Sequence, residues 1–331
     1  MSQLLVVDDL TVQLPVEGEF RTVLRDVSFS IAPGEALGLV GESGSGKSMT
    51  ARAVARLLPD GAKVTGQITF DGTSVLDLRG AALRRYRTDG IAMVFQDPRA
   101  HTNPVRTIGD FLTEALRTNR SIASRAARAR AVDVLAAVGI DDADRRLSQY
   151  PHELSGGLLQ RVMIGATLLM QPRLILADEP TTALDVTTQS EVMAILHELQ
   201  RDLDLAMLFI THDLELAAAV CDRTAVMYAG ELVEQRRSGA LHDDPLHPYT
   251  AALVQARPSV DGTSTRLEAI PGRPLSAFEA PDGCAFAPRC SHAEEACAQS
   301  RPEIRELAGG LVRCRRAEEL RGVLLVGSDH G

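Results

Sequence analysis

The stretch GESGSGKS, residues 41–48, constrains the fold of this chain more than any other part of its sequence. It fits the pattern G-x-x-x-x-G-K-[ST], whose glycines allow backbone N–H groups to converge on phosphate oxygens. The apolar run EALGLVG leads into it, and the helix-compatible run MTARAVARLL follows it. Because a helix N-terminus favours negative charge, a strand, a glycine turn and a helix in this order predict a phosphate-binding loop.

Individual positions of this loop have predicted roles in holding a nucleotide. Lys47 is expected to bring its charge to the β- and γ-phosphates, and the Ser48 hydroxyl is expected to ligate Mg²⁺. The other positions expected to contact the nucleotide are Gly41, Ser43, Gly44, Gly46 and Met49. A glycine-rich turn without a ligand is the alternative, and the flanking strand and helix argue against it.

Four short apolar runs indicate a mainly parallel sheet in an α/β fold. They are EALGLVG (35–41), IAMVFQ (91–96), LILADE (174–179) and LAMLFITH (205–212). Continuous aliphatic runs of this length are typical of strands that are buried on both faces. Open α/β sheets bind ligands at the carboxyl ends of their strands. The polar residues expected to face one crevice there are Lys47, Gln96, Asp178, Glu179 and His212.

Two of these residues form an acidic pair at the end of the third run. Asp178 is predicted to hold Mg²⁺, directly or through water. Glu179 is predicted to orient and activate the water that attacks the γ-phosphate. A solvated acidic pair at a strand end is the alternative, and the complete phosphate loop upstream disfavours it.

The composition of the chain changes twice along its length. From about residue 100 to about residue 170, Ala, Arg and Leu recur at helical spacing, which predicts a helical subdomain inserted into the sheet domain. After about residue 232, prolines become frequent and a cluster of cysteines follows. We therefore expect a main domain over residues 1–235 and a C-terminal extension over residues 236–331.

Charge and hydropathy disfavour several classes of protein. The net charge of −9 argues against bulk nucleic-acid binding, which requires a basic surface. The N-terminal sequence lacks the features of a signal peptide, and no run of about 18 apolar residues occurs. A cytosolic chain with any membrane role exercised through partners is therefore expected, and disulfides are rare in that compartment.

A second glycine pair, in LSGGLLQR, needs its own explanation. Ser155 is a natural N-cap, and the residues after Gly157 have helical periodicity, so this helix start is a further anion site. It lies far along the chain from the phosphate loop. One chain cannot readily place both glycine sites around a single triphosphate, whereas two chains arranged head to tail can.

Five motifs together carry a family resemblance. GESGSGKS, LSGGLLQR, LILADEP, TTALD and THD, in this order, resemble the nucleotide-binding subunit of ATP-binding-cassette transporters over about residues 4–235. The resemblance implies a P-loop NTPase core with a mainly parallel sheet, an antiparallel β portion and the inserted helical subdomain. It further implies an ATPase that converts ATP and water to ADP and phosphate.

The resemblance also implies roles for single residues. Gln96 would sense Mg²⁺, together with Ser48 and Asp178, and couple to the membrane subunits. Asp185 would lie in the loop that crosses the dimer interface, and His212 would contact the γ-phosphate. Phe20 is the candidate for stacking on adenine, with core packing as the alternative. The signature residues that would act in trans are Ser155, Gly156, Gly157 and Gln160.

Four cysteines gather in the C-terminal extension, with spacing C-x₅-C-x₆-C-x₁₆-C. Zinc and an iron–sulfur cluster both take four such ligands, although zinc ligands are usually more closely paired. Unligated thiols also remain open, and Cys221 is expected in the core. GCAFAPRC, FQDP and HPYTAAL resemble oligopeptide/dipeptide permease ATPases, some of which bind a [4Fe–4S] cluster. That resemblance favours such a cluster, with Zn²⁺ as the alternative, at Cys284, Cys290, Cys297 and Cys314.

The resemblance implies the ATP-hydrolysing subunit of a membrane importer, most simply one for di- or oligopeptides. Its partners would be a second ATPase subunit, identical or paralogous, two transmembrane permeases and, indirectly, an extracytoplasmic solute-binding protein, and no nucleic acid. Its place would be peripheral, on the cytoplasmic face of the cell membrane. A nickel importer ATPase and a soluble cassette ATPase without a transport role are the alternatives.

Overall fold

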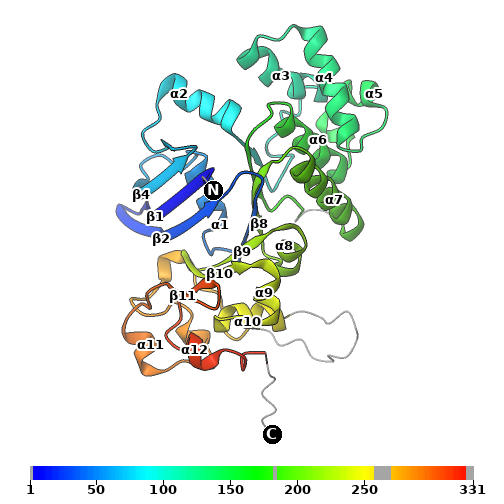
Figure 1. The fold of residues 1–331 in the computed structure, drawn as a ribbon. Coiled ribbons are helices and arrows are strands. Elements are labelled where there is room, and N and C mark those ends of the chain that lie inside the picture. Colours follow the sequence, from blue (N-terminus) through cyan, green and yellow to red (C-terminus); the bar gives the residue numbers. More distant parts are fainter. Residues whose placement is uncertain (1–2, 182–184, 257–269, 326–331) are drawn as a thin grey trace. The chain divides into compact units, whose positions relative to one another are not determined.

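The computed structural model describes residues 3–181, 185–256 and 270–325 (Figure 1). These form two compact units, each assembled from segments that are distant in sequence. One, here called the helical unit, contains mainly residues 31–36 and 75–210. The other, here called the phosphate-loop unit, contains residues 5–30, 37–74 and the chain from residue 211 onward.

The phosphate-loop unit contains a mixed set of strands that begins with the strand leading into the loop. In it, β3 (Ala36–Val40) pairs in parallel with β9 (Arg223–Tyr228), in the register Leu37 to Arg223. The next strand, β10 (Glu231–Arg237), is antiparallel to β9. From the C-terminal part of the chain, β12 (Gly310–Val312) pairs with β10, and β11 (Arg305–Leu307) pairs with β12. The extension thus contributes strands next to those that carry the phosphate loop.

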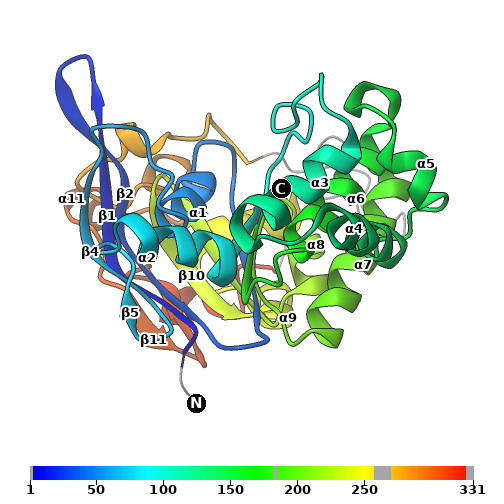
Figure 2. The same ribbon diagram turned by 90° about the horizontal axis from the view of Figure 1, so that it is seen from above.

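The same unit contains a separate antiparallel sheet with the order β2-β1-β4-β5, visible at the blue end of the chain in Figure 2. Its strands are β1 (Leu5–Val16), β2 (Glu19–Ile31), β4 (Lys63–Phe70) and β5 (Thr73–Ser74). Leu5 pairs with Phe70, and the register shifts between Asp8 and Thr11. The antiparallel portion implied by the family resemblance is therefore present.

The helices of the phosphate-loop unit are short. They are α1 (Lys47–Val54), α8 (Leu214–Val220), α9 (Ser238–Asp243), α10 (Pro248–Gln255), α11 (Glu295–Gln299) and α12 (Ala317–Leu320), with 3₁₀ turns at Ala277–Glu279 and Ala287–Arg289. Three aromatic rings form the centre of one core cluster: Tyr228 lies 4.7 Å from Tyr249, and Phe286 lies 5.2 Å from Tyr249, centroid to centroid. Aromatic pairs at this spacing stabilise a core beyond the area they bury.

The helical unit is built on three parallel strands, β6 (Ile91–Val94), β7 (Leu174–Asp178) and β8 (Ala206–Thr211). Every residue of β7 and β8 is buried, as expected for parallel strands that are covered on both faces. Together with β3, these are the four strands that the apolar runs predict, so that prediction is confirmed.

Most of the remaining residues of the helical unit are in helices (Figure 1). They are α2 (Gly80–Arg85), a π-helix (Tyr86–Gly90), α3 (Ile108–Arg120), α4 (Ser124–Ala137), α5 (Ala143–Leu147), a 3₁₀ turn (Pro151–Glu153), α6 (Gly156–Leu168) and α7 (Val186–Asp202). Thr107 caps α3 by accepting the Asp110 N–H at 3.1 Å. The alanine-rich α4 buries Ala127, Ala131 and Leu135, spaced four residues apart on one face.

The fold class predicted from the sequence is confirmed by these elements. The helices expected between about residues 100 and 170 are present. Cys221 is 6% exposed and lies in the core, as expected. In the described part of the chain, the helices are all too short or too polar to cross a membrane.

Candidate functional site

The loop between β3 and α1 turns at its glycines. A Cβ on Gly41 would lie 2.1 Å from the Met227 carbonyl oxygen, so only glycine fits that position. Gly44 and Gly46 have φ values of 79° and 108°, a left-handed conformation that glycine adopts without steric cost. Gly46 is also the N-cap of α1. The glycines of the predicted phosphate loop are therefore required by its backbone geometry.

Lys47 begins α1 and is only 4% exposed. Its Nζ donates to the Gly41 carbonyl at 2.7 Å and to the Glu42 carbonyl at 3.0 Å. The ammonium group therefore lies along the inside of the loop, where phosphate oxygens are suitable acceptors in place of carbonyl oxygens. Ser48 and Met49 follow in the first turn of α1 and are half-buried.

Glu42, inside the loop, has partners that the motif does not predict. Its backbone N–H donates to the Tyr249 hydroxyl at 2.9 Å. Its carboxylate is paired with the Arg289 guanidinium, with Nη1–Oε2 at 2.6 Å and Nη2–Oε1 at 3.1 Å. No local sequence pattern links these three residues. The only signal was that HPY and PRC each belong to a stretch that resembles the peptide-permease ATPases.

The acidic pair lies at the end of β7 in the helical unit. Asp178 is 5% exposed, and Glu179 follows it with a left-handed φ of 46°, a strained conformation that is common at functional sites. The Glu179 N–H donates to the Ile210 carbonyl at 3.0 Å, which fixes the turn after β7. The Gln96 side-chain amide donates to the Glu179 carboxylate at 3.2 Å. The structure thus brings together two of the predicted catalytic residues.

The second glycine pair begins α6. The Ser155 hydroxyl accepts the Leu158 N–H at 3.3 Å, which confirms the predicted N-cap. A Cβ on Gly157 would lie 2.3 Å from the Thr188 methyl group at the start of α7. Gln160 is 1% exposed, so its side chain is buried within the chain and is not on the surface.

Asp185 precedes α7 and anchors its first turn. Its carboxylate accepts the Thr188 N–H at 3.0 Å and the Thr188 hydroxyl at 2.8 Å. These hydrogen bonds from Thr188 hold the pKa of Asp185 below its usual value. Because Thr188 also meets Gly157, the start of α6 and the start of α7 depend on the same side chain.

His212 and Phe20 belong to the phosphate-loop unit and both are exposed. His212 directly follows β8, and Asp213 beside it caps α8 by accepting the Leu216 N–H at 2.8 Å. Phe20 is 44% exposed, so it is not core, and the Lys63 ammonium lies 3.5 Å from its ring centroid. The site residues are divided between the two units, and the single crevice expected for them stays a prediction.

Four cysteines of the C-terminal extension line one pocket, although Cys314 lies well beyond the other three in sequence. The pocket has a volume of about 340 Å³ including its open mouth, and its lining also contains His247 and His292. The Cys284 N–H donates to the Cys297 carbonyl at 2.8 Å, which joins two of the cysteine segments directly. All five cysteines of the chain are free thiols.

Burial opposes ionisation of these thiols, and backbone donors favour it. Burial raises the pKa of Cys290 and of Cys314 to about 11, and it also raises the pKa of Cys284. Hydrogen bonds from the N–H groups of Phe286 and Ala287 lower the pKa of Cys284. The N–H group of His292 lowers the pKa of Cys290 in the same way, and that of Arg316 lowers the pKa of Cys314. Donors two residues beyond a cysteine suit a thiolate that ligates a metal, since hydrogen bonds to sulfur tune such ligands.

The described residues contain no group of three or more His, Cys, Asp or Glu side chains arranged to hold a metal ion. The expected [4Fe–4S] cluster, and Zn²⁺ as its alternative, are therefore not supported by a preformed metal site. What the structure supplies is the convergence of the four thiols on one pocket and the donors beside three of them.

Known families match both parts of the chain. The family described as "ABC transporter" matches residues 24–182, and the one described as "Oligopeptide/dipeptide transporter, C-terminal region" matches residues 233–297. The oligopeptide transport ATP-binding protein OppD of Escherichia coli (strain K12) is 42% identical over 319 residues, covering 96% of this chain and 94% of the relative. A putative peptide import ATP-binding protein of Brucella abortus (strain 2308) is 43% identical over 312 residues, covering 94% of each chain.

Solved structures match the ATPase core. The structure of cbiO1 from Clostridium perfringens, part of the ABC transporter complex cbiONQ, aligns with a TM-score of 0.63 at 26% identity, covering 73% of this chain and 92% of that one. The dimeric structure of MJ0796, a bacterial ABC transporter cassette, aligns with a TM-score of 0.64 at 28% identity, covering 71% and 98%. With its glycine-determined phosphate loop and the Gln96–Glu179 pair, the chain therefore belongs to the ABC transporter ATPase family, in the branch that carries the oligopeptide/dipeptide transporter C-terminal region.

Proposed function

We propose that this chain is the ATP-hydrolysing subunit of a membrane importer for di- or oligopeptides. The observation that carries the ATPase role is the hydrogen bond between Gln96 and Glu179 beside the buried Asp178. The peptide substrate is supported by relatives named for peptide transport that match the chain through its C-terminal extension.

The nucleotide would be held mainly by the loop of residues 41–48. Lys47 would donate to the β- and γ-phosphate oxygens, together with N–H groups of the glycine turns. Mg²⁺ would be held by Ser48, Asp178 and Gln96, and it would supply positive charge to the phosphate oxygens when bound.

Hydrolysis would be in-line attack of water on the γ-phosphate. Glu179, oriented by the Gln96 amide, would orient the water and accept its proton. His212 would donate to the γ-phosphate as its charge increases. Phe20 is exposed and could stack on adenine, with the neighbouring Lys63 facing its ring.

A second ATPase chain would complete each nucleotide site. Ser155, Gly156 and Gly157 begin α6, so the helix N-terminus would meet the γ-phosphate held by the partner. Asp185, before α7, would lie in the loop that crosses the interface. Gln160 is buried, so its part in this signature would be to fix α6 from within.

Permease subunits would receive the motion of the dimer near Gln96, which is exposed. The extracytoplasmic solute-binding protein would act on those permeases, and this chain would lie peripherally at the cytoplasmic face of the membrane. We also propose that the ATPase domain spans residues 1–235 and the extension residues 236–331.

The ATPase proposal is tested with Glu179→Gln in the purified chain. The variant should bind ATP and hydrolyse it about a hundredfold more slowly or worse, since a positioned base contributes at least that much. It should also accumulate as an ATP-bound dimer in size-exclusion chromatography. Glu198→Gln, which changes an exposed carboxylate on α7, is the control and should turn over normally. Near-normal hydrolysis by Glu179→Gln would remove Glu179 from this role.

We further propose that the four-cysteine pocket holds an iron–sulfur cluster, with zinc as the alternative occupant. The cluster would be ligated by Cys284, Cys290, Cys297 and Cys314, and its role would be structural or regulatory, because ATP hydrolysis needs no redox centre. The convergence of the four thiols on one pocket and the backbone donors beside three of them support a thiolate-ligated metal group there.

Anaerobic purification tests the metal. The protein should be brown, with visible thiolate-to-iron absorption and matching amounts of iron and acid-labile sulfide. Cys290→Ser should lose the colour, whereas Cys221→Ala, which removes a core thiol outside the pocket, should keep it. Colourless protein with stoichiometric zinc would establish the other metal, and protein with neither would leave the thiols as free groups.

A further inference from the structure

The C-terminal extension directly contacts the second residue of the phosphate loop. Arg289 forms two parallel hydrogen bonds with the Glu42 carboxylate across 247 residues of sequence. The Arg289 side chain is 4% exposed and that of Glu42 is 23% exposed. A bidentate pair with one partner fully buried is well defined in geometry, unlike the exposed ion pairs common on protein surfaces.

Arg289 is itself fixed by the core of the phosphate-loop unit. Its Nε donates to the Pro271 carbonyl at 2.8 Å, and its Nη1 also donates to the Tyr228 hydroxyl at 3.3 Å. Its guanidinium carbon lies 5.9 Å from the centroid of the Phe286 ring. Arg289 cannot swing away without breaking these contacts, so the position of Glu42 is set from the extension.

The His-Pro-Tyr stretch places a second contact on the same loop residue. The ring Nδ1 of His247 accepts the Tyr249 N–H at 3.0 Å and so caps α10, and Pro248 takes the first helical position. Burial lowers the pKa of His247 to about 3, so the ring stays neutral and able to accept. Tyr249 is fully buried, and its hydroxyl accepts the Glu42 N–H at 2.9 Å.

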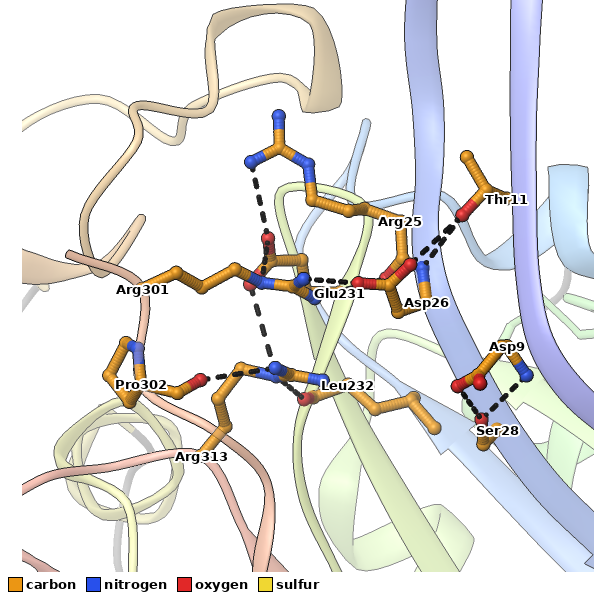
Figure 3. Close-up of polar contacts among 10 residues, drawn as sticks. All are labelled: Asp9, Thr11, Arg25, Asp26, Ser28, Glu231, Leu232, Arg301, Pro302 and Arg313. Carbon is orange, nitrogen blue, oxygen red and sulfur yellow. Dashed lines mark hydrogen bonds and ion pairs between the residues drawn. The ribbon is translucent and has the colours of Figure 1, made fainter.

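A third contact reaches the loop through the turn before β10. The Gly230 N–H donates to the Ser45 carbonyl at 2.8 Å. The next residue, Glu231, is buried, and its carboxylate is paired with Arg301 of the extension (Figure 3), with Nε–Oε1 at 2.8 Å. Arg313 of the extension lies 4.0 Å from the other Glu231 oxygen and donates to the adjacent Leu232 carbonyl at 3.2 Å.

These contacts matter because a carboxylate in a triphosphate-binding loop is electrostatically unfavourable. An unpaired Glu42 carboxylate close to phosphates would repel them. Arg289 neutralises this carboxylate, and Tyr249 fixes the backbone at the same residue. The Glu42 carbonyl accepts from the Lys47 Nζ at 3.0 Å, so the residue that the extension holds also sets the position of the ammonium group.

We propose that Arg289 and Tyr249 are positioning residues that hold Glu42 so that the phosphate loop is preformed and electrostatically ready for a nucleoside triphosphate. This role rests on the proposed function of the loop as the ATP site. It gives the C-terminal extension a direct part in ATP binding.

Binding and kinetics of the purified full-length chain test the role. Arg289→Ala should weaken binding of a fluorescent ATP analogue about tenfold or more, since hydrogen bonds to charged groups contribute on that scale. KM for ATP should rise by a similar factor while kcat changes by less than about twofold, because Arg289 does not touch the reacting atoms. The ATP affinity of Arg289→Lys should lie between those of wild type and Arg289→Ala. Lysine keeps the positive charge but cannot form the two parallel hydrogen bonds of the guanidinium group. Tyr249→Phe should weaken binding by a smaller factor.

The decisive variant is Arg289→Ala combined with Glu42→Gln. If repulsion by an unpaired carboxylate causes the loss, removing that charge should restore most of the ATP affinity. The loss in Arg289→Ala should also shrink at high salt. If Arg289 merely supported the fold, the double variant would bind no better than the single one, and thermal unfolding would track the affinity.

Arg273→Ala is the matched control. Like Arg289, Arg273 forms a bidentate pair with a glutamate, in this case Glu279. The Arg273 side chain, however, is 72% exposed and has no part in the contacts to the phosphate loop. It should leave ATP affinity unchanged. Unchanged affinity in Arg289→Ala, or no recovery in the double variant, would overturn the positioning role alone. Failure of the wild-type chain to bind ATP would overturn the proposed function as well.

Discussion

Gly157 and Thr188 show how one methyl group can link two parts of a proposed dimer site. Gly157 lies in the first turn of α6 and Thr188 in the first turn of α7, and there is no room for a Cβ between them. Thr188 also holds Asp185 through two hydrogen bonds. A methyl group added at Gly157 would therefore press on the side chain that holds Asp185.

We expect Gly157→Ala to lower ATP hydrolysis about tenfold while leaving ATP binding by the isolated chain unchanged. The added methyl would force Thr188 to move, and overpacking of this kind costs about 1–3 kcal/mol. Adding Thr188→Ser should restore activity, because serine lacks the clashing methyl and keeps the hydroxyl that binds Asp185. Steady-state ATPase assays on the single and double variants measure this.

Gly165→Ala on the same helix provides the control for Gly157→Ala. A Cβ there would have its nearest neighbour at 3.5 Å, an ordinary contact. It should have near-normal activity, and a loss as large as that of Gly157→Ala would show that α6 tolerates no added methyl anywhere.

At the scale of elements, β10 and the start of α10 are joined by one buried carboxylate. Glu234 on β10 is fully buried, and its two oxygens accept the N–H groups of Leu246 and His247, both at 2.9 Å. Burial raises its pKa to about 7, while these donors and Arg236 act in the opposite direction. The neighbouring His247 stays neutral, because burial lowers its pKa to about 3.

This carboxylate should make stability depend on pH. The folded chain binds a proton at Glu234 more tightly than the unfolded chain, so its contribution is full below about pH 4.5. It is lost as the pH rises to about 7, by on the order of 3 kcal/mol. Urea unfolding at pH 5 and pH 7.5 should show a steeper loss for wild type than for Glu234→Gln, whatever the absolute stability of the variant.

Glu306→Gln serves as the comparison for this measurement, since Glu306 is exposed on β11 in the same sheet. It should keep the wild-type pH dependence. Identical slopes for wild type and Glu234→Gln would mean that Glu234 is already ionised throughout the range.

At the scale of the whole molecule, local sequence patterns accounted for much of the structure. The four apolar runs are strands, Ser155 caps its helix, and the glycines of the loop adopt conformations that require glycine. Each of these follows from a few consecutive residues, through burial on both faces of a strand, an orphan N–H at a helix start, or backbone sterics.

Contacts between distant segments could not be predicted in the same way. The pairing of Glu42 with Arg289 and Tyr249, and the burial of Gln160, depend on which surfaces meet after folding. The sequence around Glu42 contains no pattern from which partners more than 200 residues away could be predicted. The sequence predicts the extension as a separate region. No local pattern predicted that β12 would pair with β10, in the same set of strands as β9 and β3.

The ATPase family, the phosphate loop and the polar residues at the carboxyl ends of the strands could be recognised from the sequence, because these features depend on residue types at fixed spacing. The four cysteines, expected from the sequence as one ligand set, line one pocket in the folded chain, whereas no part of the sequence indicated that the extension holds the phosphate loop through Arg289 and Tyr249. A motif consists of neighbouring residues, whereas ion pairs between distant segments form only where folding brings those segments together.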